Sequence, residues 1–130
     1  MSGSLALDTN AAIAYAARVG AVRAVVDAAS GIVLPAPVLG ELLFGAKLSA
    51  RAAENERGIL ALARRCVLAP VDAIVAARYA STCVELKRLG RPIPENDLWI
   101  AAICLERNIP LLTADGHFRH VPGLDVRGWG

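Results

Sequence analysis

The 130-residue sequence has few aromatic residues and no long uninterrupted apolar run. Aromatic residues make up 5% of the chain and hydrophobic residues 55%, which predicts a core packed mainly from Ala, Val and Leu. No apolar segment approaches the roughly 18 residues that span a bilayer. The N-terminus also lacks the basic flank and apolar stretch of a signal peptide. We therefore expect a cytoplasmic protein and, from its length, a single domain over residues 1–130.

Several common kinds of reactive site are also missing. Cys66, Cys83 and Cys104 are too widely spaced for a zinc site or a disulfide framework, so we expect reduced core residues. The two histidines, His117 and His120, fall in one predicted loop, where we expect ordinary exposed side chains. No Ser/His/Asp or Cys/His arrangement and no glycine-rich phosphate loop can be recognised. Carboxylates remain as the candidate chemical groups.

Short apolar segments alternate with helical patterns along the chain. The predicted strands are residues 4–8, 31–35, 67–71, 109–113 and 124–129. The predicted helices are residues 10–18, 21–29, 37–48, 59–66, 73–90 and 95–108, with a polar break at 49–58 and a loop at 114–123. This alternation predicts an α/β fold, in which right-handed crossovers build a parallel sheet covered on both faces.

Three aspartates occupy informative positions in this pattern. Asp8 ends the first predicted strand and Asp115 lies just beyond the fourth. Ligands of an open parallel sheet bind outside the carboxyl ends of the strands, so both aspartates are expected on that rim. Asp97 lies in the first turn of a helix, where the helix dipole alone stabilises an acid by about 0.3 to 1 kcal/mol. Asp8 likewise has the alternative role of a helix cap.

Glu41 is a fourth candidate, inside the apolar segment "VLGELLFGA". Gly40 precedes it and Gly45 follows one turn later, and each glycine in a helix interior costs about 1 kcal/mol relative to alanine. The glycines indicate a close approach of a backbone or a ligand near Glu41, although close helix packing explains them equally well.

A convergence of the four acids would require a cation. Two carboxylates 4 Å apart repel each other by about 4 kcal/mol at an effective dielectric constant of 20. Oxygen ligands of this kind favour Mg²⁺ or Mn²⁺. An acidic site without an evident nucleophile suggests that a metal-activated water attacks a phosphodiester.

Four segments together resemble the signature segments of PIN-domain ribonucleases, in particular the VapC toxin branch of bacterial toxin–antitoxin pairs. They are, in order, "LDTN", "GELLFGA", "ENDLWIAA" and "LLTADGHF", and the resemblance extends from about residue 5 to the closing "VPGLDVRGW". The resemblance implies a three-layer α/β/α sandwich with a central five-stranded parallel sheet. It also implies one or two Mg²⁺ or Mn²⁺ ions and endonucleolytic cleavage of RNA.

The resemblance assigns roles to individual residues. Asp8, Glu41 and Asp97 correspond to the core metal-site acids of the family, and Asp115 corresponds to the more variable fourth acid. Family members often carry a basic residue beside the fourth acid, whereas Gly116 and His117 follow Asp115 here. This difference affects the expected substrate contacts and leaves the metal site unchanged.

Three further polar residues flank these acids. Asn10 and Thr113 resemble the family's groups that hydrogen-bond to the metal-site carboxylates and orient them. The alternatives are a helix cap for Asn10 and an ordinary strand-end residue for Thr113. Asn96, next to Asp97, is expected to be only a cap.

The charge and the resemblance together suggest partners. The net charge is only +2, but 12 of the 14 basic residues are arginines, which suit phosphate recognition or reflect compositional bias. If a metal neutralises four acids, the remaining 14 basic and 8 acidic residues leave a balance of +6 toward RNA. The resemblance further implies a homodimer whose groove takes an amphipathic antitoxin segment, with a basic side chain reaching the acids.

Three other functions compete with this interpretation. A phosphoacceptor receiver domain also places acids at strand ends, but it needs a lysine on a late strand, and Lys47 and Lys87 both lie on predicted helices. A non-catalytic PIN-like module that binds RNA or a partner has no reason to keep four mutually repelling acids. A metal-dependent, structure-specific DNA nuclease is the third alternative.

Overall fold

The structure, a computed structural model, describes residues 3–129 and contains one parallel sheet. Its strands are β1 (Ser4–Leu7), β2 (Gly31–Pro35), β3 (Val67–Ala69), β4 (Leu111–Leu112) and β5 (Val126–Arg127). The strand order is β3-β2-β1-β4-β5, with β1 paired to both β2 and β4. The chain therefore builds outward from β1 first in one direction and then in the other. The carboxyl ends of β1 and β4 meet at this reversal, where ligands bind in sheets of this kind.

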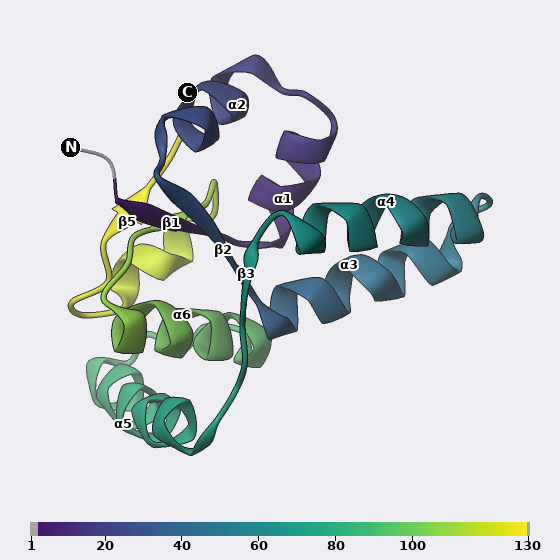
Figure 1. Cartoon of the computed structure of the whole chain (residues 1–130). Coiled ribbons are helices and arrows are strands. Elements are labelled where there is room, and N and C mark those ends of the chain that lie inside the picture. Colours follow the sequence, from purple (N-terminus) through teal and green to yellow (C-terminus); the bar gives the residue numbers. More distant parts are fainter. Residues whose placement is uncertain (1–2, 130) are drawn as a thin grey trace.

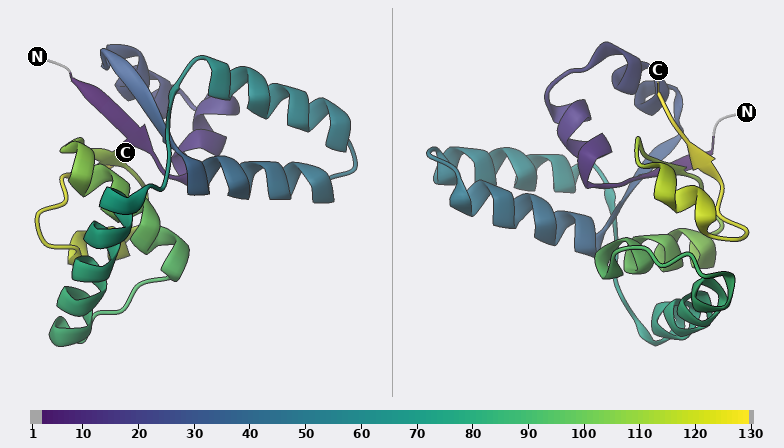
Figure 2. Two further views of the ribbon diagram at one scale, coloured as in Figure 1. Left: turned by 60° about the horizontal axis from the view of Figure 1, so that its bottom comes forward. Right: turned by 180° about the vertical axis from the view of Figure 1, so that it is seen from behind.

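Residues 3–129 also form six α-helices and one 3₁₀ helix. They are α1 (Thr9–Ala16), α2 (Gly20–Ala28), α3 (Ala36–Leu48), α4 (Ala52–Arg64), α5 (Ala73–Leu89), α6 (Glu95–Arg107) and η1 (Gly116–His120). Figures 1 and 2 show α1 and α2 on one face and α5 and α6 on the other, while α3 and α4 form an antiparallel pair that extends away from the sheet. The predicted three-layer α/β/α sandwich is thus confirmed.

The core is aliphatic, as the composition predicts. Leu7, Leu34 and Leu111 fill the middle of the sheet and are fully buried. Helix α6 contributes an unbroken buried segment, residues 100–104, which belongs to the same hydrophobic core. Phe118 of η1 is also fully buried, so this short turn is fixed to the core.

The boundaries of α5 follow directly from the residues at its ends. The side chain of Asp72 accepts a hydrogen bond from the backbone N–H of Val75 at 2.9 Å, which caps the first turn. Gly90 ends the helix in the left-handed conformation, with φ of 66°. Both ends agree with the prediction. None of the described helices is long and apolar enough to cross a membrane.

Three features differ from the sequence-based expectations. The polar break predicted at 49–58 is mostly helical, because α4 begins at Ala52 and its charged residues face solvent in ion pairs such as Lys47 Nζ–Glu56 Oε1 at 2.6 Å. The predicted loop at 114–123 contains η1. All three cysteines are free, but only Cys104 belongs to the buried core, since Cys66 and Cys83 are half-buried.

The close approach predicted at Gly40 and Gly45 does not come from the chain itself, and the approach of a ligand stays a prediction. A Cβ atom built on either glycine meets no atom within 4 Å. Neither helix packing nor a neighbouring backbone therefore requires glycine there.

Candidate functional site

Asp8 directly follows β1 and is the N-cap residue of α1. It is almost completely buried, with 3% of its surface exposed. Its Oδ1 accepts a hydrogen bond from the backbone N–H of Ala11 at 2.8 Å, and its Oδ2 accepts one from the hydroxyl of Thr113 at the end of β4. Asp8 is therefore both a helix cap and a buried acid that joins the two central strands.

The charge of Asp8 is unfavourable in this position. Burial raises the pKa of its carboxyl, and the hydrogen bonds from Thr113 and Ala11 offset the effect only in part. The negative charges of Asp115 and Asp97 raise the pKa further. Ionised Asp8 thus costs stability in the folded protein as long as no cation is nearby.

Asp97 lies in the first turn of α6, where it is partly buried. Burial is the main cause of its raised pKa, contact with His117 lowers the pKa, and the charges of Glu41 and Asp115 raise it. Nε2 of His117 lies 2.6 Å from Oδ2 of Asp97. The expectation that His117 is an ordinary exposed loop residue is therefore wrong, because η1 turns it toward the acids.

Glu41 projects from α3 and is exposed, yet its carboxylate is held from two sides. The hydroxyl of Thr9 donates a hydrogen bond to Oε1 of Glu41 at 2.8 Å. The side-chain amide of Asn96 donates to the same oxygen. Helices α1 and α6 thus both contact a side chain of α3.

The fourth acid, Asp115, follows β4 and is half-buried. Its backbone N–H donates a hydrogen bond to Oγ1 of Thr113 at 2.9 Å, while the Thr113 hydroxyl donates to Asp8. Thr113 therefore orients Asp8 and also fixes the backbone at Asp115. This is the orienting contact that the resemblance implies for Thr113.

The four acids share one electrostatic environment at this rim. Asp8 is influenced by Asp97 and Asp115, and Asp97 by Glu41 and Asp115. Within residues 3–129, however, no three His, Cys, Asp or Glu side chains form a ready-made metal site. Asp8 and Glu41 instead accept hydrogen bonds, and Asp97 shares one with His117. Their oxygen atoms and the repulsion among neighbouring acids suit a hard divalent cation.

Asn10 and Asn96 do not take the cap positions of their helices, and the orienting role of Asn10 stays a prediction. Asn10 is exposed, and Asp8 takes the cap position of α1 while Thr9 makes the contact to Glu41. Asn96 is not a cap either, because Pro94 occupies that position in α6. The sequence did contain a signal for Thr9 and Asn96, since each is the immediate neighbour of a candidate acid.

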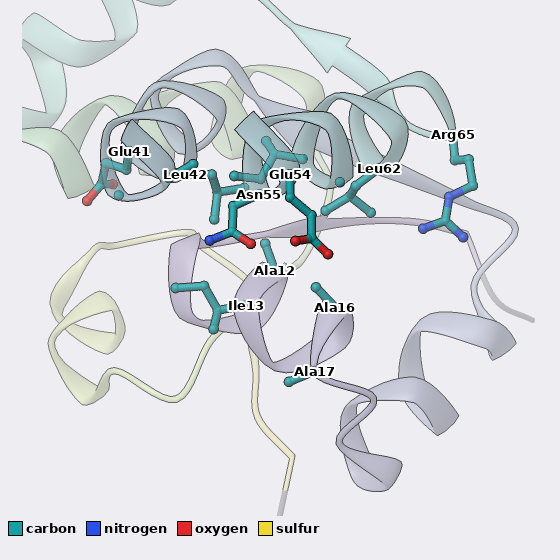
Figure 3. Close-up of a pocket in the computed structure, with 14 residues that line it drawn as sticks. Ala12, Ile13, Ala16, Ala17, Glu41, Leu42, Glu54, Asn55, Leu62 and Arg65 are labelled. Atoms are coloured by element: carbon teal, nitrogen blue, oxygen red, sulfur yellow. The ribbon is translucent and has the colours of Figure 1, made fainter. Parts of the chain in front are cut away.

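A groove borders the site on the side of α1, α3 and α4. Its volume is about 750 Å³, and most of its lining is apolar, including Ala12, Leu42 and Leu62. Glu41 and Arg65 lie at its opposite ends (Figure 3). The groove therefore runs from the acidic rim to Arg65 along a mostly apolar lining, with Glu54 and Asn55 between the two ends.

Arg65, at the end of the groove opposite Glu41, shares a tyrosine ring with a second arginine. The guanidinium carbons of Arg23 and Arg65 lie 5.8 and 6.0 Å from the ring centroid of Tyr15. Such cation–π contacts hold both cations beside the same ring.

Comparison with known proteins gives one consistent result. A model of the PIN domain family matches residues 5–124. Ribonuclease VapC5 of Mycobacterium tuberculosis is 39% identical over 54 residues, which are 42% of this chain and 40% of that protein. Ribonuclease VapC1 of Haemophilus influenzae is 32% identical over 90 residues, 68% of this chain and 67% of that protein.

A solved structure agrees over nearly the whole chain. VapBC-5 from Mycobacterium tuberculosis, described as a member of the VapBC family of toxin–antitoxin systems, superimposes with a TM-score of 0.76 and 27% sequence identity. The match covers 96% of each chain. This structural match therefore covers far more of the chain than the 54 residues that align with ribonuclease VapC5. Those aligned residues make up less than half of VapC5.

Proposed function

Because this chain belongs to the PIN-domain family, we propose that it is a metal-dependent endoribonuclease and the toxin of a toxin–antitoxin pair. The names of its relatives support the ribonuclease activity, and the VapBC-5 structure supports the antitoxin partner. Family membership excludes the phosphoacceptor receiver interpretation. The observation that carries the proposal is a group of four neighbouring acids. Asp8 and Asp115 follow β1 and β4, and Asp97 at the start of α6 is influenced by Glu41 of α3 and by Asp115. One sheet and a family match over residues 5–124 support a single PIN domain over residues 1–130.

Asp8, Glu41, Asp97 and Asp115 would hold Mg²⁺ or Mn²⁺ in this proposal. When bound, the cation supplies charge neutralisation at the phosphate and activation of a water molecule for attack. Carboxylate oxygens are ligands that these ions prefer. The pKa values of Asp8 and Asp97 are raised mainly by burial and further by the neighbouring acids, and a bound cation would offset both effects.

The protein's own residues prepare this rim for RNA. Thr113 and the backbone of Ala11 fix Asp8 inside the fold, so its carboxylate cannot turn away. Glu41 is exposed and lies where a phosphodiester can approach from solvent. With the four acids neutralised, the rest of the chain has 14 basic and 8 acidic residues, which favours a polyanionic substrate.

Cleavage of structured RNA in the presence and absence of EDTA tests the activity. We expect Mg²⁺- or Mn²⁺-dependent cutting that excess EDTA abolishes and that Asp97→Asn lowers by orders of magnitude. Asp125→Asn is the matched control, because Asp125 is exposed and pairs with Arg127 at 3.1 Å, away from the four acids. Robust cutting in excess chelator contradicts the proposal, and RNA binding without any cutting favours the non-catalytic module.

The groove is the proposed binding surface for the antitoxin. Its apolar floor suits one face of an amphipathic segment. A basic side chain of that segment would lie at Glu41, near the acids, and an acidic one at Arg65. The opposite charges at the two ends thus define the direction in which the segment lies.

A further inference from the structure

Glu41 is the one exposed member of the four acids and is held by two hydrogen bonds to a single oxygen. The Thr9 hydroxyl donates to Oε1 at 2.8 Å, and the Asn96 amide donates to the same atom. Within residues 3–129, Oε2 of Glu41 has no hydrogen-bond partner. The exposed Glu41 side chain thus has Oε1 restrained by two hydrogen bonds and Oε2 available for another ligand.

Neither donor is needed by its own helix. Thr9 is the first residue of α1, but the side chain of Asp8 caps that helix. Asn96 is the second residue of α6, and the cap position there belongs to Pro94, which has no side-chain cap bond. Both side chains instead donate to Glu41 on another helix, which lies 32 residues from Thr9 and 55 residues from Asn96 in the sequence.

The two donors also flank two other acids of the site. Thr9 directly follows Asp8, and Asn96 directly precedes Asp97. Any movement of Glu41 relative to α1 or α6 would therefore strain a bond to a residue adjacent to another acid. In this way the two bonds fix the position of Glu41 relative to both Asp8 and Asp97.

We propose that Thr9 and Asn96 are positioning residues that hold Glu41 toward the acidic rim with its second carboxylate oxygen free for a divalent cation. The inference rests on the proposed metal-dependent function. Ordering the side chain in advance reduces the entropy lost when a cation binds. Both donors are neutral, so they restrain Glu41 without cancelling the negative charge that attracts the cation. A lysine or arginine at either position would compete with the cation for the Glu41 carboxylate.

Removal of each donor tests the proposal. Thr9→Val keeps the side-chain shape without the hydroxyl, Thr9→Ser restores the hydroxyl, and Asn96→Ala removes the amide. Ser81→Ala is the control, because the Ser81 hydroxyl bonds only to the Ala77 carbonyl at 3.2 Å on the exposed side of α5. Each protein is titrated with Mn²⁺ in the absence of RNA by calorimetry. Melting in EDTA and RNA cleavage are then measured on the same samples.

We expect Thr9→Val and Asn96→Ala to weaken Mn²⁺ binding by roughly 10-fold or more, the usual effect of removing a group that orients a metal ligand. Thr9→Ser and Ser81→Ala should bind Mn²⁺ like the wild type, and all variants should melt in EDTA near the wild-type temperature.

Wild-type Mn²⁺ affinity in both donor-deletion variants overturns the proposal. So does an affinity loss that Thr9→Ser fails to restore, or a wild type that binds no Mn²⁺. If Mn²⁺ binding follows the expected pattern but the wild type cuts no RNA, the positioning role stands and the proposed ribonuclease function fails. The two conclusions can therefore be distinguished.

Discussion

At the scale of single residues, Asp8 combines two roles with opposite effects on stability. Its carboxylate caps α1 through the N–H of Ala11, which stabilises the helix. Its burial and its acidic neighbours raise its pKa, which makes the charged form costly. Asparagine caps helices about as well as aspartate but has no charge. Its amide nitrogen can donate to the Thr113 hydroxyl where Asp8 accepts, so the substitution keeps the cap, removes the charge and reverses that one bond.

We expect Asp8→Asn to stabilise the metal-free protein near neutral pH by about 1 kcal/mol or more, the energy of one screened carboxylate pair. Because the folded-state pKa of Asp8 is raised, wild-type stability in EDTA should fall as the pH rises from the ordinary aspartate value through the raised pKa. The mutant should lack this part of the pH dependence. Thermal melts in EDTA across this pH range measure both effects.

Added Mg²⁺ should raise the melting temperature of the wild type and have little effect on Asp8→Asn, because a bound ligand stabilises only a protein with an intact site. Asp72→Asn is the matched control, since Asp72 caps α5 in the same way through Val75. Equal Mg²⁺ shifts in the wild type and Asp8→Asn would leave Asp8 with the role of a cap alone.

At the scale of elements, α1 and the α3–α4 pair form the groove between the acidic rim and Arg65. Gly45 lines this groove, and a Cβ atom there would meet no atom within 4 Å. A larger side chain at Gly45 would therefore extend into the groove and not into the core. This gives the second glycine of α3 a physical role that the first, Gly40, does not share.

We expect Gly45→Leu to weaken binding of the cognate antitoxin by about 10-fold or more, because the leucine side chain would fill space in the groove that the antitoxin segment needs. RNA cleavage and folding should be retained, because leucine has a higher helix propensity than glycine. Gly40→Leu makes the same change on the same helix outside the groove lining and should bind normally. A binding titration with purified antitoxin compares the two, and equal affinities would exclude the groove as the binding surface.

At the scale of the whole molecule, exposed apolar side chains suggest self-association. Phe44 and Leu48 are 66% and 73% exposed. They are four residues apart on α3 and so lie on the same face of the helix. Neither lines the groove, so a homodimer formed through this face leaves the groove open to an antitoxin.

We expect light scattering at tens of micromolar to report twice the 13.6 kDa mass of the chain. Phe44→Glu combined with Leu48→Glu should give a folded monomer, because burying unpaired charges at an interface is costly. Leu89→Glu on α5, at a residue 54% exposed, is the control and should remain dimeric. A wild type that is strictly monomeric under these conditions contradicts the prediction.

The sequence alone determined the layered fold and the position of the acids. Alternating short apolar strands and helical patterns allow few topologies, and parallel strands bring their carboxyl ends to one edge. Asp8 and Asp115 follow two such strands, so the rim could be predicted from their positions alone. The two ends of α5 could likewise be predicted from nearby residues, because Asp72 caps the first turn and Gly90 ends the helix.

Only the tertiary structure decided which side chains hold those acids. The bonds that fix Asp8 and Glu41 join residues 105, 32 and 55 positions apart, and the contact of Asp97 with His117 spans 20. Helix and strand patterns describe neighbours within one or two turns and contain no information about such distant pairs. The roles of Thr9, Asn96 and His117, like the open space beside Gly45, arise when α1, α3, α6 and η1 pack around the ends of β1 and β4.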